Sequence, residues 1–291
     1  MNAYHAGELA VQRRMGQAEI AARVGRMIRT EIPAAAAAFL IEQPMVVLAA
    51  TDDAGRVWAS LVTGPAGFVH TDDQTIAVGA LPVPGDPLHN VLRRPDQRVG
   101  MIAIDPQTRR RMRVNGTAQP TTNGLRIHPD QVYSNCPKYI SRRHIETVDA
   151  DNPEPAVRHA EVLDQRTLQV IARADTFFIG SADPDGNADA SHRGGNPGFL
   201  QVLSPNRLRW PDYRGNSMFM TLGNISANPH CGLLIPDWET GTTLQLTGTA
   251  EIIWDEGPQC SVEFIVEEVV ELTGASPLRW GQAELSPANP A

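Results

Sequence analysis

The chain has 291 residues, of which 42% are hydrophobic and 20% charged, and its formal net charge is −8. This composition is typical of a folded protein and argues against global disorder. The acidic balance argues against a broad phosphate-contacting surface, so we expect no nucleic-acid partner.

The sequence gives no sign of a membrane or secretory protein. The longest apolar run, residues 34–50, is interrupted by Glu42 and Pro44, and it falls short of the roughly 20 residues that a membrane-spanning helix needs. The N-terminus has no basic region followed by an apolar one, so no secretory signal is expected. The three cysteines, Cys136, Cys231 and Cys260, fit neither a metal-ligand spacing nor a disulfide framework. We therefore expect a cytoplasmic protein with reduced thiols and no metal.

The predicted elements alternate between helical segments and two series of short strands. A helix is predicted over residues 7–30, where Leu9, Ile20, Val24 and Met27 can share one face. The first series of strands covers 45–49, 57–62, 75–78, 97–104 and 111–118, with a short helix at 87–93. After a loop that starts at residue 151, a helix is predicted from Val157 to residue 173. The second series covers 176–180, 188–193, 207–210, 230–235, 242–253 and 261–272, with a helix at 217–226.

The two series are related by an internal repeat. Residues 50–55 match residues 181–186 at an offset of 131, and residues 113–118 match residues 245–250 at an offset of 132. The matches stay in order, which indicates a duplication. Many short strands with Asp- and Gly-containing turns and one helix per copy predict a small barrel in each copy. The fold class is therefore mainly β with helices (α+β).

The repeat sets the predicted domain boundaries. The five predicted parts are an N-terminal helical segment (1–38), a first barrel copy (39–122), a linker with a helix (123–173), a second barrel copy (174–275) and an extended tail (276–291).

The second copy carries cationic residues where the first is apolar. His192 and Arg193 stand at the positions of Leu61 and Val62. This difference indicates that only the second copy is equipped to bind an anion. The alternative is that the charged residues are simply solvated.

A second group of polar residues, Arg214, Asn216 and Ser217, precedes the predicted helix of the second copy. The N-terminus of a helix offers free N–H groups, and arginine offers a planar fork that suits phosphate. An anion site is one interpretation of these residues, and a surface arginine beside an ordinary helix cap is the other.

Two further arginine clusters are expected to be solvated turns. Residues 109–111 follow a predicted hairpin tip, and residues 142–144 hold two arginines and a histidine. The second cluster could also contact an anionic substrate.

The run 177–253 resembles the FMN-binding split barrel of the pyridoxamine 5'-phosphate oxidase-like superfamily. The resemblance is carried by the turn at 183–186, by residues 191–199 and 211–216, and by Asn228-Pro229. Residues 5–13 and 135–140 also resemble a bacterial subgroup with two barrel copies.

The resemblance implies two tandem split β-barrels that form an intrachain pseudo-dimer and hold one FMN in the groove between them. Lys138 would lie near the flavin, where a cation stabilises the reduced anionic ring, or it is a surface lysine. Cys136 beside it is a redox thiol or an inert one. No catalytic residue stands out. The expected cofactor-binding residues are Ser191, His192, Arg193, Gly194, Pro211, Asp212, Tyr213, Arg214, Asn216, Ser217 and Lys138.

The implied function is an FMN-dependent oxidoreductase that acts on a small organic substrate, with NAD(P)H as a possible donor. The chain lacks the Arg- and Lys-rich phosphate strand of the vitamin-processing oxidase, so the resemblance does not extend to pyridoxamine phosphate. The alternatives are a non-catalytic protein that binds flavin, haem or deazaflavin, and a cofactor-free structural module. Because small barrels often cover their edges by association, a homodimer is expected.

Overall fold

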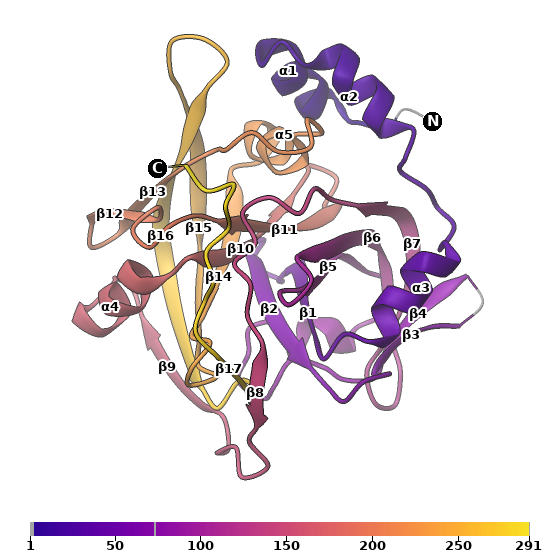
Figure 1. Cartoon of the computed structure of the whole chain (residues 1–291), viewed down its shortest axis with the longest axis vertical. Coiled ribbons are helices and arrows are strands. Elements are labelled where there is room, and N and C mark those ends of the chain that lie inside the picture. Colours follow the sequence, from indigo (N-terminus) through magenta and orange to yellow (C-terminus); the bar gives the residue numbers. More distant parts are fainter. Residues whose placement is uncertain (1–2, 73, 291) are drawn as a thin grey trace.

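A computed structural model describes residues 3–72 and 74–290 of the chain (Figure 1). The first barrel copy is a seven-stranded antiparallel sheet with the order β2-β1-β5-β6-β7-β4-β3. Its strands are β1 (Met45–Thr51), β2 (Val57–Thr63), β3 (Val69–Asp72), β4 (Thr75–Val78), β5 (Gln97–Asp105), β6 (Arg110–Pro120) and β7 (Leu125–Ser134).

The second copy repeats this order as β11-β10-β14-β15-β16-β13-β12, and β9 (Ala156–Ala160) pairs with β16 in addition. Even the irregularity between β6 and β7 at Asn115/Gly116 recurs between β15 and β16 at Thr247/Gly248. The duplication is thus visible in topology and register. The strands are β10 (Thr176–Ala182), β11 (Ala188–Gly194), β12 (Gln201–Ser204), β13 (Arg207–Pro211), β14 (His230–Pro236), β15 (Thr243–Trp254) and β16 (Cys260–Thr273).

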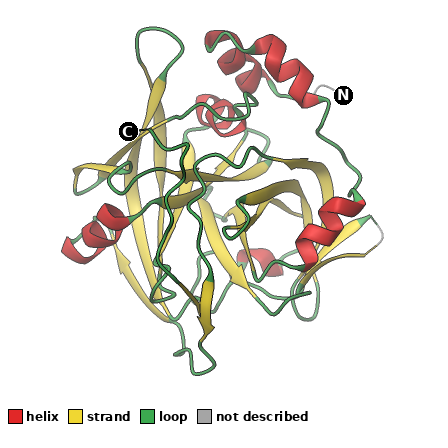
Figure 2. Ribbon diagram, in the orientation of Figure 1, coloured by secondary structure: helices red, strands yellow, loops and turns green. Residues whose placement is uncertain are grey.

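Each sheet curves around its own hydrophobic core without closing, so the fold is a mainly β tandem of split barrels (Figure 2). Trp58 lies in the first core and Trp210 in the second. A third apolar cluster joins the copies and includes Val47 of β1, Ala59 of β2 and Phe178 of β10. The two copies therefore pack against each other as an intrachain pseudo-dimer.

Two equivalent glycines allow this close approach. A Cβ atom on Gly100 of β5 would lie 2.5 Å from backbone atoms of Asp189 and Ala190. A Cβ atom on Gly232 of β14 would lie 2.5 Å from the Val57 carbonyl oxygen. At both places one strand of each copy contacts the backbone of the other copy, where no side chain fits.

The helices differ from the prediction mainly in extent. The N-terminal helix predicted over 7–30 is two helices, α1 (Ala6–Arg14) and α2 (Ala18–Gly25), separated by Gly16 in the left-handed conformation. The helix predicted at 87–93 is a single 3-10 turn, η1 (Val91–Arg93), because it begins beside a Pro-containing loop and the chain before Pro95 must leave the helical region. Its counterpart is α5 (Met220–Ala227), and α3 (Ala34–Ile41) was not predicted.

The segment predicted as a linker, 123–173, contains more strand than expected. β7 completes the first sheet, and the residues predicted as helix from Val157 begin with β9, whose backbone pairs with β16. A helix, α4 (Gln165–Arg173), follows. The predicted extended tail supplies β17 (Leu278–Trp280), which pairs with β8 (Ile145–Val148).

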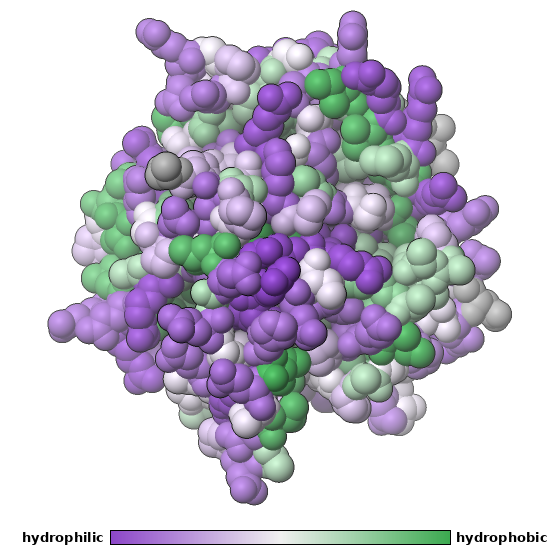
Figure 3. All heavy atoms as spheres, in the orientation of Figure 1, coloured by the Kyte–Doolittle hydropathy of each residue, from purple (hydrophilic) through white to green (hydrophobic). Residues whose placement is uncertain are grey.

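Hydrophilic residues cover most of the face shown in Figure 3, and apolar residues lie between them in small groups. Within residues 3–72 and 74–290, the helices are too short to span a bilayer.

Candidate functional site

A cationic pocket lies between the two copies. The first copy contributes Arg111 and Arg113 of β6, and the second contributes residues 192–194 of β11, the loop 211–219 that we call the pocket loop, and the start of α5. Its volume is about 80 Å³. The site is therefore composite, because each copy provides one wall.

Arg113 crosses from the first copy to a buried carboxylate of the second. Its Nη1 lies 3.1 Å from Oδ2 of Asp189, and its Nη2 donates to Oγ of Ser191. The Tyr133 hydroxyl donates to the same carboxylate at 3.0 Å. The Arg113 and Asp189 side chains are 9% and 4% exposed, so this ion pair is almost fully desolvated. Burial lowers the pKa of Arg113, but Asp189 and Tyr133 outweigh it and the pKa is raised. Arg113 thus stays charged.

Arg111 and Arg193 bring two more guanidinium groups to the pocket. Arg193 Nη1 donates to Ser191 Oγ at 2.7 Å, and its Nη2 lies 3.4 Å from the Asp212 carboxylate. Burial, reinforced by Arg113 and Arg193, lowers the pKa of Arg111 to about 9. Three guanidinium groups thus face two carboxylates, which leaves positive charge uncompensated.

His192 is held neutral inside this cluster. Burial is the largest cause of its pKa lying well below the ordinary value, and Arg111, Arg193 and Arg113 lower it further. Its Nδ1 lies 2.7 Å from Arg111 Nη1, and a neutral ring can accept that hydrogen bond.

The pocket loop closes the remaining side. Ser217 and Phe219 adopt left-handed backbone conformations, with φ of 66° and 58°. Asn216 Oδ1 accepts from the backbone N–H of Met218 at 3.1 Å. The Tyr213 ring packs 5.2 Å from the ring of Tyr139. The loop has a defined irregular conformation. A helix was predicted from residue 217, but residues 217–219 belong to this loop and α5 begins at Met220.

The equivalent position in the first copy is filled by a hydrogen-bond network around Asp86. Gln245 takes the place of Arg113, and its Nε2 donates to Asp86 Oδ2 at 3.0 Å and to the Ala59 carbonyl oxygen at 2.9 Å. Ser60, the counterpart of Ser191, donates to Asp86 Oδ1 at 2.6 Å. Burial raises the pKa of Asp86 to about 7. The cationic pocket therefore has no equivalent at this position.

Most of the predicted cofactor-binding residues lie together. His192, Arg193, Gly194, Pro211, Asp212, Tyr213, Asn216 and Ser217 line the cationic pocket. Ser191 lies behind its wall, bonded to Arg113 and Arg193. Arg214 and Lys138 are exposed and lie outside the lining.

The sequence interpretation missed the two arginines of the first copy. Arg111 was expected to be solvated at the start of the strand predicted over 111–118, but in β6 its side chain points to His192. Arg111 and Arg113 alternate with the core residues Met112 and Val114, and this period of two marks one face of a strand. The other expected solvated cluster is also partly buried, because Arg143 forms an ion pair with Asp175 at 3.0 Å.

The donor set of the cationic pocket fits the phosphate of FMN. Among the described residues, the Nε–H donors of Arg111, Arg113 and Arg193 are buried without a hydrogen-bond partner. Buried donors of this kind normally have a partner, and a phosphate monoester supplies three acceptor oxygens and about −1.5 to −2 charges. The volume takes a phosphate-sized anion, whereas a whole cofactor needs roughly 300 Å³ or more. The phosphate of a bound nucleotide would therefore occupy this pocket, and the rest of the cofactor would lie outside it.

Comparisons with known proteins give one family match. Residues 147–276 match the model of the pyridoxamine 5'-phosphate oxidase family. No curated protein is significantly similar to the chain in sequence.

Several solved structures are similar to part of the chain. A candidate pyridoxamine 5'-phosphate oxidase of Lactobacillus delbrueckii is 19% identical, with 38% of this chain and 98% of that chain covered and a TM-score of 0.31. An FAD-binding protein of Mesorhizobium loti is 13% identical, with 40% and 98% covered and a TM-score of 0.30. The haem storage protein HutZ of Vibrio cholerae is 11% identical, with 37% and 92% covered and a TM-score of 0.29.

The matched residues 147–276 contain the whole second sheet, including β11 and the pocket loop. The first copy repeats the topology of that sheet strand for strand. Residues 147–276, which hold the second copy, are thus similar to the pyridoxamine 5'-phosphate oxidase family, and this match covers less than half of the chain.

Proposed function

We propose that the chain is an FMN-dependent oxidoreductase that binds one FMN in the cationic pocket. The observation that carries the proposal is the buried cluster of Arg111, Arg113 and Arg193, whose charge exceeds that of the two carboxylates beside it. A phosphate monoester would neutralise the cluster and take up its free N–H groups. Hydrogen bonds to charged groups contribute about 1.5–3 kcal/mol each, so a few of them supply much of the roughly 8 kcal/mol of a micromolar ligand.

The role of this chain's residues would be to bind and orient the cofactor. Arg113 and Arg193 would hold the phosphate, with Ser191 fixing both guanidinium groups. The flavin itself would carry the electrons between a donor such as NAD(P)H and a small organic acceptor. Asp212 is paired with Arg193, and His192 is neutral and buried. The described lining therefore offers no free general base.

The first test is the absorbance spectrum of the purified protein, followed by release and identification of any chromophore. We expect FMN at about one per chain, since the equivalent position in the first copy is filled by Asp86 and Gln245. NAD(P)H oxidation with added acceptors then separates an enzyme from a non-catalytic binder. A protein that neither carries nor takes up FMN would overturn the proposal.

Two arginines of the second copy form a matched pair for mutation. Arg193→Ala should weaken FMN binding by about 10- to 100-fold, because it removes charge-assisted bonds from the pocket. Arg214→Ala should change the affinity little, because Arg214 is exposed and outside the lining. Titration of flavin fluorescence measures both. Equal losses in the two variants would contradict the assigned site.

A further inference from the structure

The pocket loop is held from outside by the N-terminal helices. The Gln12 side chain of α1 donates to the Met218 carbonyl oxygen at 2.9 Å, and this bond is buried. The Ser217 hydroxyl donates to Oε1 of Gln17 at 2.5 Å. Met218 and Met220 pack in one cluster with Tyr4 and Ala21. Residues 217–220, which line the pocket, therefore have the N-terminal helices at their back.

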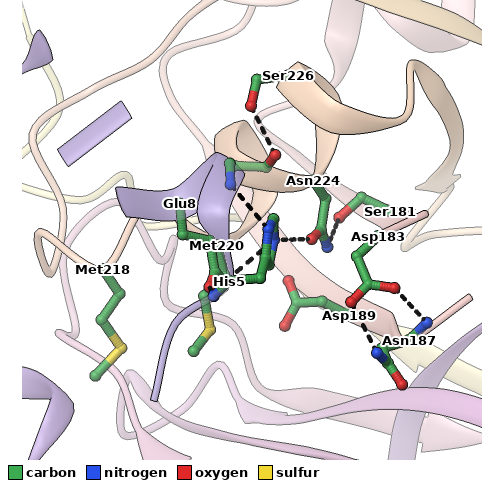
Figure 4. Close-up of polar contacts among 12 residues, drawn as sticks. His5, Glu8, Ser181, Asp183, Asn187, Asp189, Met218, Met220, Asn224 and Ser226 are labelled. Atoms are coloured by element: carbon green, nitrogen blue, oxygen red, sulfur yellow. Dashed lines mark hydrogen bonds and ion pairs between the residues drawn. The ribbon is translucent and has the colours of Figure 1, made fainter. Parts of the chain in front are cut away.

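The same helices are anchored on α5, which follows the pocket loop. His5 Nδ1 accepts from the Gly7 N–H, and its Nε2 donates to Asn224 Oδ1 at 2.9 Å. Asn224 in turn donates to Ser181 of β10 at 3.0 Å. Figure 4 shows the His5 ring directed toward Asn224, with Glu8 beside His5, whose backbone N–H donates to Glu8 Oε2 at 2.8 Å. A Cβ atom on Gly7 would lie 2.4 Å from the Gly223 carbonyl oxygen, so α1 and α5 are in direct backbone contact.

This arrangement holds the pocket loop against the pocket, and we call this the closed position of the loop. The pocket volume of about 80 Å³ takes a phosphate but not a whole FMN, so the rest of the cofactor would lie outside the pocket. Of the walls, β6 and β11 belong to the two sheets, whereas the pocket loop is irregular backbone. The loop is therefore the wall whose position depends most on contacts from outside the two sheets.

We propose that the N-terminal hairpin, residues 5–25, is a latch that holds the pocket loop closed and sets the rates at which the cofactor enters and leaves. The inference rests on the proposed function, because it takes FMN as the ligand. Gln12 and Gln17 are the positioning residues of the latch, and neither lines the pocket.

Stopped-flow fluorescence of FMN with Gln12→Ala and Gln17→Ala tests the latch. Each variant removes one bond that forms only when the pocket loop is closed. Both the association rate and the dissociation rate of FMN should therefore rise, by about three- to tenfold for each bond. The Kd should stay nearly constant, because both rates rise together. Arg13→Ala is the matched control, because Arg13 is an exposed residue on the same helix, and it should leave both rates unchanged. A rise in the dissociation rate alone would show that the loop is only part of the binding surface, and it would overturn the latch. Unchanged rates would overturn it as well.

Hydrogen exchange separates a failed latch from a failed FMN assignment. In the cofactor-free protein, the Gln12→Ala and Gln17→Ala variants should speed exchange of the amides of residues 216–220, while β14 and β15 keep their protection. If the wild-type chain takes up no FMN, this local acceleration still supports the latch, and exchange equal to that of wild type overturns it. Gln12 is buried, so Gln12→Ala is expected to cost stability, whereas Gln17 is only half-buried and its replacement should be tolerated. Gln17→Ala therefore provides the measurement if the Gln12→Ala variant does not fold.

Discussion

A few side chains make the two copies chemically different. Gln245 and Arg113 occupy equivalent positions on β15 and β6, and Ser60 and Ser191 occupy equivalent positions on β2 and β11. Gln245 and Ser60 both form hydrogen bonds with Asp86. Arg113 and Ser191, which bond to each other, belong to the cationic pocket. The same backbone therefore supports a filled core position in one place and a cationic pocket in the other.

The Arg113–Asp189 ion pair should show strong coupling in a double-mutant cycle. Arg113→Gln leaves a buried carboxylate unpaired, which costs about 3–5 kcal/mol in the free energy of unfolding. Adding Asp189→Asn removes the stranded charge, so the double variant should recover most of that loss. Chemical denaturation of the four proteins measures the coupling. Additive losses would show that the two groups do not depend on each other.

At the scale of elements, the docking of α1 should depend on pH. Burial, with smaller contributions from Asp189 and Asp183, raises the pKa of Glu8 from 4.5 to about 8, although the His5 backbone N–H opposes this. Neutral Glu8 is thus favoured in the folded state. Its contribution to stability is complete below pH 4.5 and is lost as the pH rises toward 8.

Glu8→Gln should remove this dependence. The variant keeps an acceptor for the His5 N–H and carries no charge, so it should be more stable than wild type at pH 8 and similar to it near pH 5. The expected gain is on the order of 2–4 kcal/mol for docking of the helix. Hydrogen exchange of α1 at the two pH values measures it, with Glu19→Gln on the exposed face of α2 as control. A variant that is equally or less stable at pH 8 would contradict the buried neutral acid.

The elements that repeat could be predicted from the sequence, and those that depend on tertiary pairing could not. Most strands of the two sheets fall close to their predicted ranges, because both copies repeat the same turns. β9 is a short edge strand that pairs only with β16, so nothing local distinguishes it from a helix. Arg111 begins a predicted strand, but it was expected to be solvated because three adjacent arginines conceal the alternation with Met112.

At the scale of the whole molecule, pairing of the copies creates the site. Arg113 reaches the pocket only because β6 of one copy lies beside β11 of the other, and Gly100 allows that contact. Gly232 allows the equivalent contact at the filled position, against Val57 and Trp58. A second pairing, between two chains, is not required for this site, and the homodimer remains a prediction that light scattering can test.

The two glycines should therefore separate stability from binding. Gly100→Ala and Gly232→Ala both place a methyl group 2.5 Å from the backbone of the opposite copy, and overpacking of this kind costs about 1–3 kcal/mol. Both variants should lose similar stability to denaturant. Only Gly100→Ala should also weaken FMN binding, because it displaces Asp189, the partner of Arg113. Gly215→Ala, which meets no close contact, is the control for stability. Equal losses of affinity in Gly100→Ala and Gly232→Ala would show that the position of Asp189 does not determine binding, and the composite site would have to be abandoned.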